Sequence, residues 1–395
     1  MVRGPWTIET LLFAIYFAFG LSWLSYSPLL PEIEKTFTLD HAHGALLISS
    51  VSLAKAFVPL LAGLLATRLG ISRAIGLGAW LAALAVVAPW MPGFDSMLVA
   101  RFLFGVGGAI VVTLMGAMVM PLFSTRQLPV VNGLNNVAVN VGVTSALYAS
   151  VPCSESLGWR ATLMAFGCIS LVLALAWQFL LPNGGTVAVK RQPKVSLGQV
   201  LRRRETWLVA LAFTGPLSLY LCLNTWLPTH YVETFHLTRA SASSLTALMN
   251  LVGIPTAVLA GLLTSRLGLR RPLIIAAGLL MVPAACGLVL APSNELRHLC
   301  AVMLGISFFL YTAPLFTIPM ELPEISTGEV AMIQGVVYSL AYFSSSVAPV
   351  LVGRLRDVTG SYVPGLLLFA VLAGSLALAG LLLPETGPGR SSAER

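Results

Sequence analysis

The sequence has few charged residues. Only 10% of its 395 residues are Asp, Glu, Lys or Arg, whereas 57% are hydrophobic. Soluble domains carry about 25% charged residues, so a chain this apolar lacks the polar groups that would cover its surface in water. The five cysteines show no disulfide or metal-site spacing, and we expect buried thiols. The five histidines fall near the predicted ends of spans, so we expect no metal and no cofactor.

Long apolar runs recur along the whole chain. Each has about twenty residues, enough for a helix to cross about 30 Å of hydrocarbon. A membrane β-barrel would instead show alternating segments of about ten residues. The sequence therefore predicts an all-α integral membrane protein with twelve spans, and its first apolar run, which lacks a small-residue cleavage site, is expected to remain as span 1. The predicted spans are 7–30, 43–66, 72–91, 96–121, 130–152, 160–182, 206–229, 241–265, 272–291, 296–320, 328–353 and 362–384.

The net charge of +8 is unevenly distributed. Basic residues cluster in the loops after even-numbered spans, which is the positive-inside pattern. It predicts a multi-pass protein of the bacterial inner membrane with both termini in the cytoplasm, and it indicates a lipid bilayer rather than nucleic acid as the partner. We expect a monomer. Two groups depart from the pattern: Glu321, Glu324 and Glu329 after span 10, and Arg354 and Arg356 after span 11.

The two halves of the chain resemble each other. Residues 36–73 align without gaps to 234–271 at an offset of 198, including the match of 61–65 to 259–263. We therefore expect two pseudo-symmetric six-helix bundles, 1–182 and 206–395, joined by a cytoplasmic linker at 183–205. In folds of this kind the solute site lies near the membrane midplane between the halves.

Three segments carry a family resemblance: the loop at 63–73, Arg101 with the glycines after it, and Pro384-Glu385-Thr386-Gly387. They resemble signatures of the major facilitator superfamily, which implies a transporter that works by alternating access and is not an enzyme. The resemblance implies gating roles for the residues of the loop and of its repeat, namely Gly63, Arg68, Gly70, Arg73, Gly261, Arg266 and Gly268. The Asp that the family usually has is Thr67 here, and Ser265 in the repeat, so the gating network departs from the family pattern.

Lys55 is the most informative single residue. It stands near the middle of span 2 on a face with Ser52 and Pro59, twelve or more residues from the loop arginines. An ionisable group at this depth is costly, and no buried carboxylate is evident as a partner, so we expect it to bind an anionic solute. A structural ion pair or hydrogen bonds to backbone carbonyls are the alternative.

Other polar residues in the spans are weaker candidates. Arg101 near the end of span 4 either serves coupling or ties neighbouring helices together. Amides and phenols of inward-facing spans either contact solute or pack between helices. These candidates are Asn136, Asn140, Asn224, Asn250, Tyr26 and Tyr338, with Tyr220, Tyr311 and Tyr342 as further possibilities. Spans 1, 4, 5, 7, 8, 10 and 11 show no clear mid-membrane Asp or Glu that would bind a coupling proton.

Two branches of the superfamily resemble this chain more closely. Gly133-Leu134-Asn135 with 140–143 is similar to the span-5 signature of nitrate/nitrite porters, although the C-terminal counterpart lacks it. Trp226-Leu227-Pro228 and 332–335 resemble the cyanate/nitroimidazole branch. Both imply a small, planar, often anionic solute. The alternatives are efflux of amphipathic compounds, or a membrane enzyme or receptor, which would need a catalytic set that the sequence does not show.

Overall fold

The computed structural model describes residues 4–124, 127–180, 197–323 and 325–387, except the side chains of 60, 63, 64, 67, 128–130, 132, 133, 136, 327 and 328. Within these ranges the secondary structure is helical. The helices are α1 (Pro5–Leu24), α2 (Leu30–Phe37), α3 (His41–Leu69), α4 (Ile71–Ala82), α5 (Phe94–Val119), α6 (Leu128–Leu157), α7 (Trp159–Leu180), α8 (Leu197–Arg202), α9 (Arg204–Phe235), α10 (Arg239–Leu267), α11 (Arg271–Leu290), α12 (Asn294–Leu310), α13 (Thr312–Thr317), α14 (Thr327–Thr359), α15 (Val363–Leu372) and α16 (Ser375–Leu382), with short 3-10 turns at Ser27–Leu29, Ala83–Val86, Ala88–Trp90 and Ile318–Met320.

Twelve helical segments of the described chain are long and apolar enough to span a membrane, which confirms the predicted fold class. Four of them are composite, because a turn interrupts the helix inside the span, as between α1 and α2. The first span runs to Phe37, whereas we predicted its end at residue 30. Of the expected linker, residues 183–196 lie outside the described part, and its remainder forms α8 and the start of α9.

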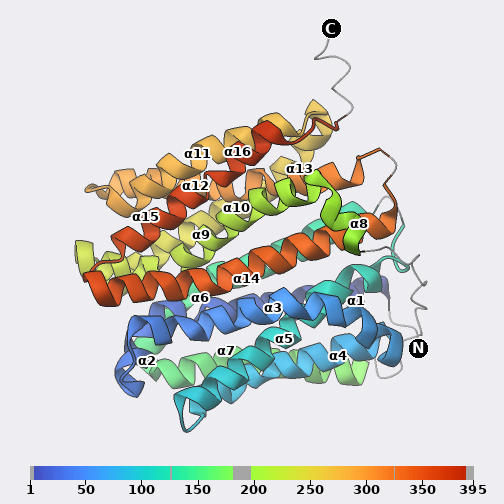
Figure 1. Cartoon of the computed structure of the whole chain (residues 1–395). Coiled ribbons are helices and arrows are strands. Elements are labelled where there is room, and N and C mark those ends of the chain that lie inside the picture. The colour runs from blue at the N-terminus through green and yellow to red at the C-terminus, as the bar shows by residue number, and fades with distance from the viewer. Residues whose placement is uncertain (1–3, 125–126, 181–196, 324, 388–395) are drawn as a thin grey trace.

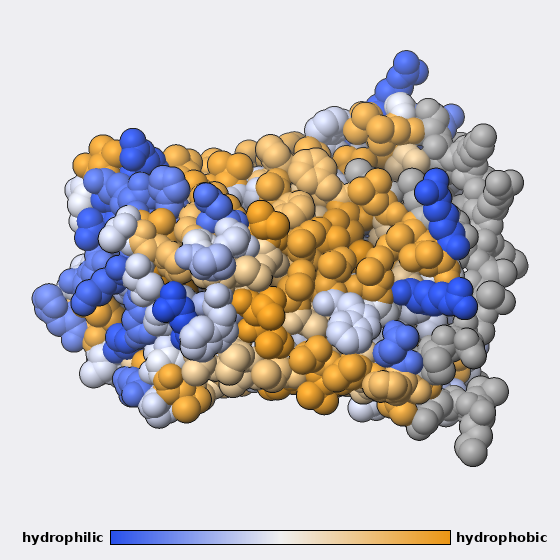
Figure 2. Space-filling view, turned by 90° about the horizontal axis from the view of Figure 1, so that it is seen from below, coloured by the Kyte–Doolittle hydropathy of each residue, from blue (hydrophilic) through white to orange (hydrophobic). Residues whose placement is uncertain are grey.

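The helices form two groups that lie side by side (Figure 1), α1 to α7 below and α9 to α16 above in that view. The start of α1, the end of α16 and α8 lie at the same end of the molecule, which we call the linker end, and we call the opposite end the distal end. One face of the molecule shows a broad band of hydrophobic residues between hydrophilic residues gathered toward its ends (Figure 2). This band is the surface that the lipid tails contact.

Glycines bring helices of one half into close contact. Gly142 on α6 faces Gly20 on α1, and a Cβ added to Gly142 would lie 2.7 Å from the backbone nitrogen of Leu21. Without a hydrophobic driving force between helices in lipid, such small residues allow the backbone contact that holds a bundle together. The backbones of α1 and α6 therefore lie in direct contact at this point.

Prolines end α1 near the middle of its span. Pro28 has no N–H, so the carbonyl of Leu24, four residues earlier, loses its helical donor. The helix ends at Leu24, a short turn follows, and α2 begins at Leu30 with Pro31 in its first turn. The last carbonyls of α1 are left to be satisfied by other groups, and Tyr26 lies at this break.

Candidate functional site

Arg101 satisfies the end of α1. Its side chain is 0% exposed and lies over the ring of Tyr26, 4.0 Å from the ring centroid. The guanidinium donates from Nη1 to the carbonyl of Ser22 and from Nη2 to that of Trp23, both at 2.9 Å, and from Nε to the carbonyl of Leu47 on α3 at 3.0 Å. A cation at a helix C-terminus is electrostatically favourable. Its three donating nitrogens are all occupied, so in this conformation Arg101 joins α5 to α1 and α3.

Lys55 lies in a different environment. It is the central residue of α3, 14 residues from either end, and only 2% of it is exposed. Its ammonium faces four aromatic rings: Trp23 at 4.3 Å, Tyr342 at 4.8 Å, Phe19 at 5.3 Å and Tyr16 at 5.8 Å from the ring centroids. Such cation–π contacts offset part of the cost of burying the charge.

No hydrogen bond or ion pair joins Lys55 to another described residue, and Ser52, on the same face of α3, is buried with its hydroxyl unpaired. Three rings come from α1, but Tyr342 comes from α14 of the other half. The ammonium therefore lies at the boundary between the halves, where it retains the capacity to donate hydrogen bonds.

The C-terminal half contributes a network of amides. Tyr220 donates to Oδ1 of Asn250 at 2.6 Å, and Nδ2 of Asn250 donates to Oδ1 of Asn224 at 2.8 Å. Asn224 in turn donates to the carbonyl of Tyr220. The structure thus brings together two of the predicted site residues, Asn224 and Asn250. Their polar groups are largely satisfied by each other, which favours helix packing in this conformation.

Tyr338 belongs to an aromatic cluster next to Lys55. It stacks on Phe316 at 5.0 Å and on Tyr342 at 6.3 Å, and it meets Phe213 edge-on at 5.5 Å. The cluster continues the aromatic surroundings of Lys55 into the C-terminal half. Tyr311 is 3% exposed, with no hydrogen bond of its hydroxyl to a described residue.

The two amides predicted on span 5 are less well defined. The side chain of Asn136 lies outside the described residues. Asn140 is half-buried on α6, and its backbone carbonyl accepts a hydrogen bond from the hydroxyl of Thr144 at 2.8 Å.

The predicted gating residues all lie at the linker end. Gly70 (φ 82°) and Gly268 (φ 63°) end α3 and α10 in backbone conformations that favour glycine, which explains why the repeat has Gly at both positions. Arg68, Arg73 and Arg266 are exposed, and the side chain of Thr67 lies outside the described residues. Nothing packs where a Cβ would be added to Gly261, and Gly63 lies on α3 at a position whose surroundings are outside the described part.

Residues that we did not predict as gating or binding residues form the polar network of the linker end in the C-terminal half. Arg270 is paired with Glu321, Nη2 to Oε1 at 2.7 Å, and Thr386 donates to Oε2 of Glu321 at 2.7 Å. The Glu385 carboxylate accepts the backbone N–H groups of Arg270 and Arg271 at 2.8 and 3.0 Å, at the start of α11. Burial raises the pKa of Glu321, but hydrogen bonds from Arg270 and Thr386 and the charge of Arg270 outweigh it and leave the pKa below its usual value.

These pairs also explain the acidic loop after span 10. Glu321 neutralises Arg270, and Glu329 binds Arg203 at 3.0 Å, so these carboxylates balance basic residues of the same end. Glu324 lies outside the described residues.

At the distal end the two halves are joined by direct bonds. Ser27 donates to the carbonyls of Asn224 and Thr225, the latter at 2.9 Å. Backbone N–H groups of His41 and Ala42 donate to the Asp357 carboxylate, both at 3.2 Å. All hydrogen bonds between the halves among the described residues lie on the distal side of Lys55. They are Ser27 to Asn224 and Thr225, Arg239 to Glu32 and Pro28, Ser243 to Leu147, His41 and Ala42 to Asp357, and Tyr362 to His41.

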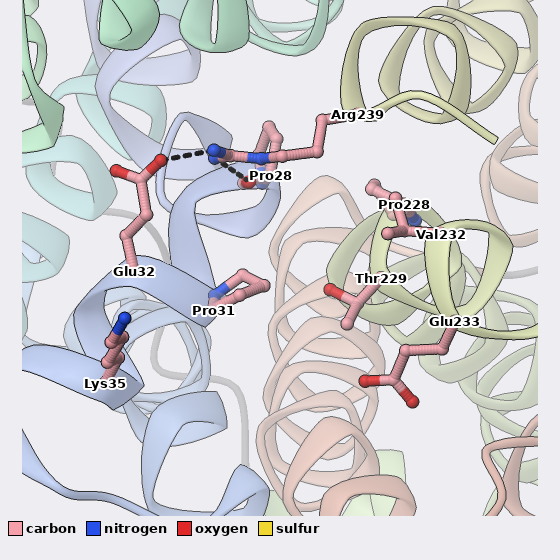
Figure 3. Close-up of a pocket in the computed structure, with 9 residues that line it drawn as sticks. All are labelled: Pro28, Pro31, Glu32, Lys35, Pro228, Thr229, Val232, Glu233 and Arg239. Atoms are coloured by element: carbon pink, nitrogen blue, oxygen red, sulfur yellow. Dashed lines mark hydrogen bonds and ion pairs between the residues drawn. The ribbon is translucent and has the colours of Figure 1, made fainter. Parts of the chain in front are cut away.

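A small pocket of about 310 Å³ marks this closed distal end (Figure 3). Glu32 on α2 and Arg239 on α10 point toward each other across it and form an ion pair. Arg239 also donates to the carbonyl of Pro28, and Ser154 donates to Glu32 at 3.2 Å. Lys35, Thr229 and Glu233 complete its polar lining, and both halves of the chain contribute to it.

One buried carboxylate escaped the sequence prediction. Glu9 on α1 is only 3% exposed, and its Oε2 lies 3.5 Å from Nδ2 of Asn135 on α6. Span 1 was among those in which we expected no clear mid-membrane carboxylate, and Glu9 lies close to its predicted start. The contact with α6 buries it, and only the fold shows this.

Comparisons with known proteins agree with this architecture. A family model described as Major Facilitator Superfamily matches residues 12–349. A probable nitrate/nitrite antiporter of Thermus thermophilus is 26% identical over 93% of this chain and 85% of its own, and a 2-nitroimidazole transporter of Escherichia coli is 25% identical over 90% and 89%. A crystal structure of a bacterial homologue of the human lysosomal transporter Spinster, inward-facing and unoccupied, aligns with a TM-score of 0.77 at 15% identity, covering 97% of this chain and 98% of the other.

Proposed function

The chain belongs to the major facilitator superfamily, and from this premise we propose that it moves a small anion across the bacterial inner membrane by alternating access. A multi-pass transporter of small solutes, rather than an enzyme, is what the family establishes. The anionic solute, the mechanism and the residues involved are our proposal.

The observation that carries the proposal is the state of Lys55. It lies about 21 Å from either end of α3, because its 14 residues on each side rise about 1.5 Å each. At that depth a charge without a counter-ion is costly. A small anion held by the ammonium would supply the missing partner. The aromatic rings around it favour a planar, weakly hydrated anion over a strongly hydrated one, because they offer few hydrogen bonds to replace lost water.

The names of the relatives support the same class of solute. One is a probable nitrate/nitrite antiporter and another a 2-nitroimidazole transporter, and the solutes in both names contain a planar nitrogen–oxygen group. We propose Lys55 as the anchor of the anion, with Tyr338 and Asn140 as further candidate contacts. Asn224, Asn250 and Asn136 join them after rearrangement, while Tyr26 and Arg101 hold α1 in place.

The distribution of contacts between the halves supports alternating access. The hydrogen bonds between the halves, among the described residues, lie distal to Lys55, so the halves are held together there. The basic residues of the linker end support an orientation with that end in the cytoplasm. In this orientation the structure corresponds to a state closed toward the outside. Opening to the outside breaks the distal bonds, and the exposed arginines near Gly70 and Gly268 then approach the opposite half.

A thermal-shift series on the purified protein tests the proposal. Nitrate, cyanate, phosphate and amphipathic cations are compared, because a ligand at about 100 times its Kd stabilises the folded state by about 2.7 kcal/mol. We expect nitrate or cyanate to raise the melting temperature of the wild type and of Lys35→Met, a matched exposed lysine, but not that of Lys55→Met.

Equal stabilisation of both lysine variants by anions would refute the role of Lys55. Stabilisation by amphipathic cations alone would refute the anionic solute and support efflux of amphipathic compounds.

A further inference from the structure

Glu9 and Asn135 form a buried polar pair that the proposed function leaves unused. Glu9 is 3% exposed and Asn135 is 7% exposed. Only Nδ2 of Asn135 bonds Glu9, at 3.5 Å to Oε2, and the other carboxylate oxygen, Oε1, is buried with no partner among the described residues. The side-chain oxygen of Asn135, Oδ1, is buried and unpaired as well. Two neighbouring side chains thus present two acceptor oxygens to which no described residue donates.

A single proton supplies the missing hydrogen-bond donor. Added to Oε1, it converts the carboxylate to a neutral carboxylic acid with one O–H donor, while Oε2 continues to accept from Asn135. The new donor is the group that Oδ1 of Asn135 lacks. An ionised carboxylate buried without a counter-ion would instead bear its full desolvation cost.

Among the described residues of the helices packed against α1, no charged side chain takes the place of this proton. The helices packed against α1 are α6, α7, α5 and, more loosely, α3. The described charged and titratable residues of these helices lie far along the helix from the level of Glu9, or they are exposed at the linker end. They are Tyr148, Cys153 and Glu155 on α6, Arg160 and Cys168 on α7, Asp95 and Arg101 on α5, and His41, His43, Lys55 and Arg68 on α3. The side chains of Asn132 and Asn136 lie outside the described residues.

Glu9 shares a helix face with the surroundings of Lys55. Glu9, Tyr16 and Trp23 recur every seven residues on α1, and two of these face the Lys55 ammonium. Glu9 and Tyr16 are about 10 Å apart along the axis, two helical turns. The carboxyl and the ammonium therefore belong to the same half and do not overlap, so a proton and an anion can be bound at the same time.

From this arrangement we infer that Glu9 is a proton-binding site and that the protein carries one proton together with each monovalent anion. The inference rests on the proposed function for its anion. Loading both sites leaves neither the ammonium nor the carboxyl with an uncompensated charge, whereas loading one leaves the other charged in the low-dielectric interior. The protein therefore changes most readily between its inward-open and outward-open states when both sites are occupied. The transported pair of proton and anion carries no net charge.

The proton site is tested first without any solute. Infrared difference spectra of the purified, solute-free protein at neutral pH should contain a protonated-carboxyl C=O band. That band should be absent in Glu9→Gln and present in Glu155→Gln, a matched exposed carboxylate on α6. Glu9→Gln has the shape and charge of the protonated form, so we expect it to fold as stably as the wild type. A wild-type spectrum identical to that of Glu9→Gln would overturn the assignment whatever the solute is.

Coupling is tested in proteoliposomes with nitrate and a trapped pH dye. Each nitrate taken up by the wild type and by Glu155→Gln should bring in one proton, and a pH difference of one unit should support about tenfold accumulation. Glu9→Gln should exchange nitrate across the membrane at the wild-type rate but accumulate none.

Accumulation by Glu9→Gln equal to that of the wild type would refute the coupling role. Absence of nitrate exchange in every variant, with the carboxyl band intact, would instead count against nitrate as the solute and leave the proton site standing.

Discussion

Replacing Arg101 separates a structural role from a solute-binding role. Arg101→Met keeps a long apolar side chain over Tyr26 but removes the hydrogen bonds to the carbonyls of Ser22, Trp23 and Leu47. Hydrogen bonds from charged groups contribute about 1.5–3 kcal/mol each, and part of this is offset because a guanidinium no longer has to be buried. We expect a net loss of about 2–4 kcal/mol.

The loss is measured as a thermal melt of the detergent-purified protein without solute. For a bundle of this size each kcal/mol corresponds to about 2–4 °C, so the melting temperature should fall by roughly 5–15 °C. Arg101→Lys should recover only part of it, because one ammonium cannot reach three carbonyls in the geometry of the planar guanidinium. Arg354→Met removes an exposed arginine at the distal end and should melt like the wild type.

The opposite pattern would refute the reasoning. If Arg101→Met melts like the wild type but is no longer stabilised by anions, its guanidinium binds the solute and the carbonyl contacts are incidental. A large loss of stability with anion-dependent stabilisation intact would support the structural role.

Three further predictions concern the contacts that hold the helices. Glu32→Arg should repel Arg239 and favour opening of the distal end, so that amide hydrogen exchange there speeds up a few-fold; adding Arg239→Glu should restore the wild-type rate, and no change in the single variant would contradict the latch. Gly142→Ala should lower the melting temperature because α1 and α6 must separate, whereas Gly116→Ala, which meets nothing, should not, and equal effects would remove the argument. The pKa of Glu321 is lowered on folding, so its stabilisation is present at neutral pH and lost as the pH falls through that lowered pKa; the difference in melting temperature between wild type and Glu321→Gln should shrink as the pH is lowered, and a constant difference would exclude the charge as its cause.

The sequence predicted the spans well because a long apolar run has one stable outcome in lipid. The ends of most spans agree with the helices to within a few residues, and the glycines of the repeat lie where the backbone turns. The contacts of Lys55 could not be predicted in the same way. Its position at mid-span was visible, but the approach of Tyr342 from α14 depends on how the halves meet.

Glu9 and Arg101 show the same limit. Whether Glu9 reaches water depends on the packing of α6 against α1, which no local pattern contains. The role of Arg101 depends on the break after Leu24, which leaves carbonyls of α1 free to accept. The prolines that cause the break are visible in the sequence. The hydrogen bonds between the freed carbonyls and an arginine 77 residues after Leu24 are not.

The two halves share a backbone repeat, but the side chains at matched positions differ in charge. At the offset of 198 the partner of Lys55 is Gly253, so the two backbones match there while the mid-span ammonium belongs to the first half. Under the proposed function the solute is bound mainly by the N-terminal half, and the C-terminal half forms the opposite surface against which the N-terminal half rotates. Substitutions that change which solute is accepted should then accumulate in the first half, and those that change only the pace of the cycle in the second.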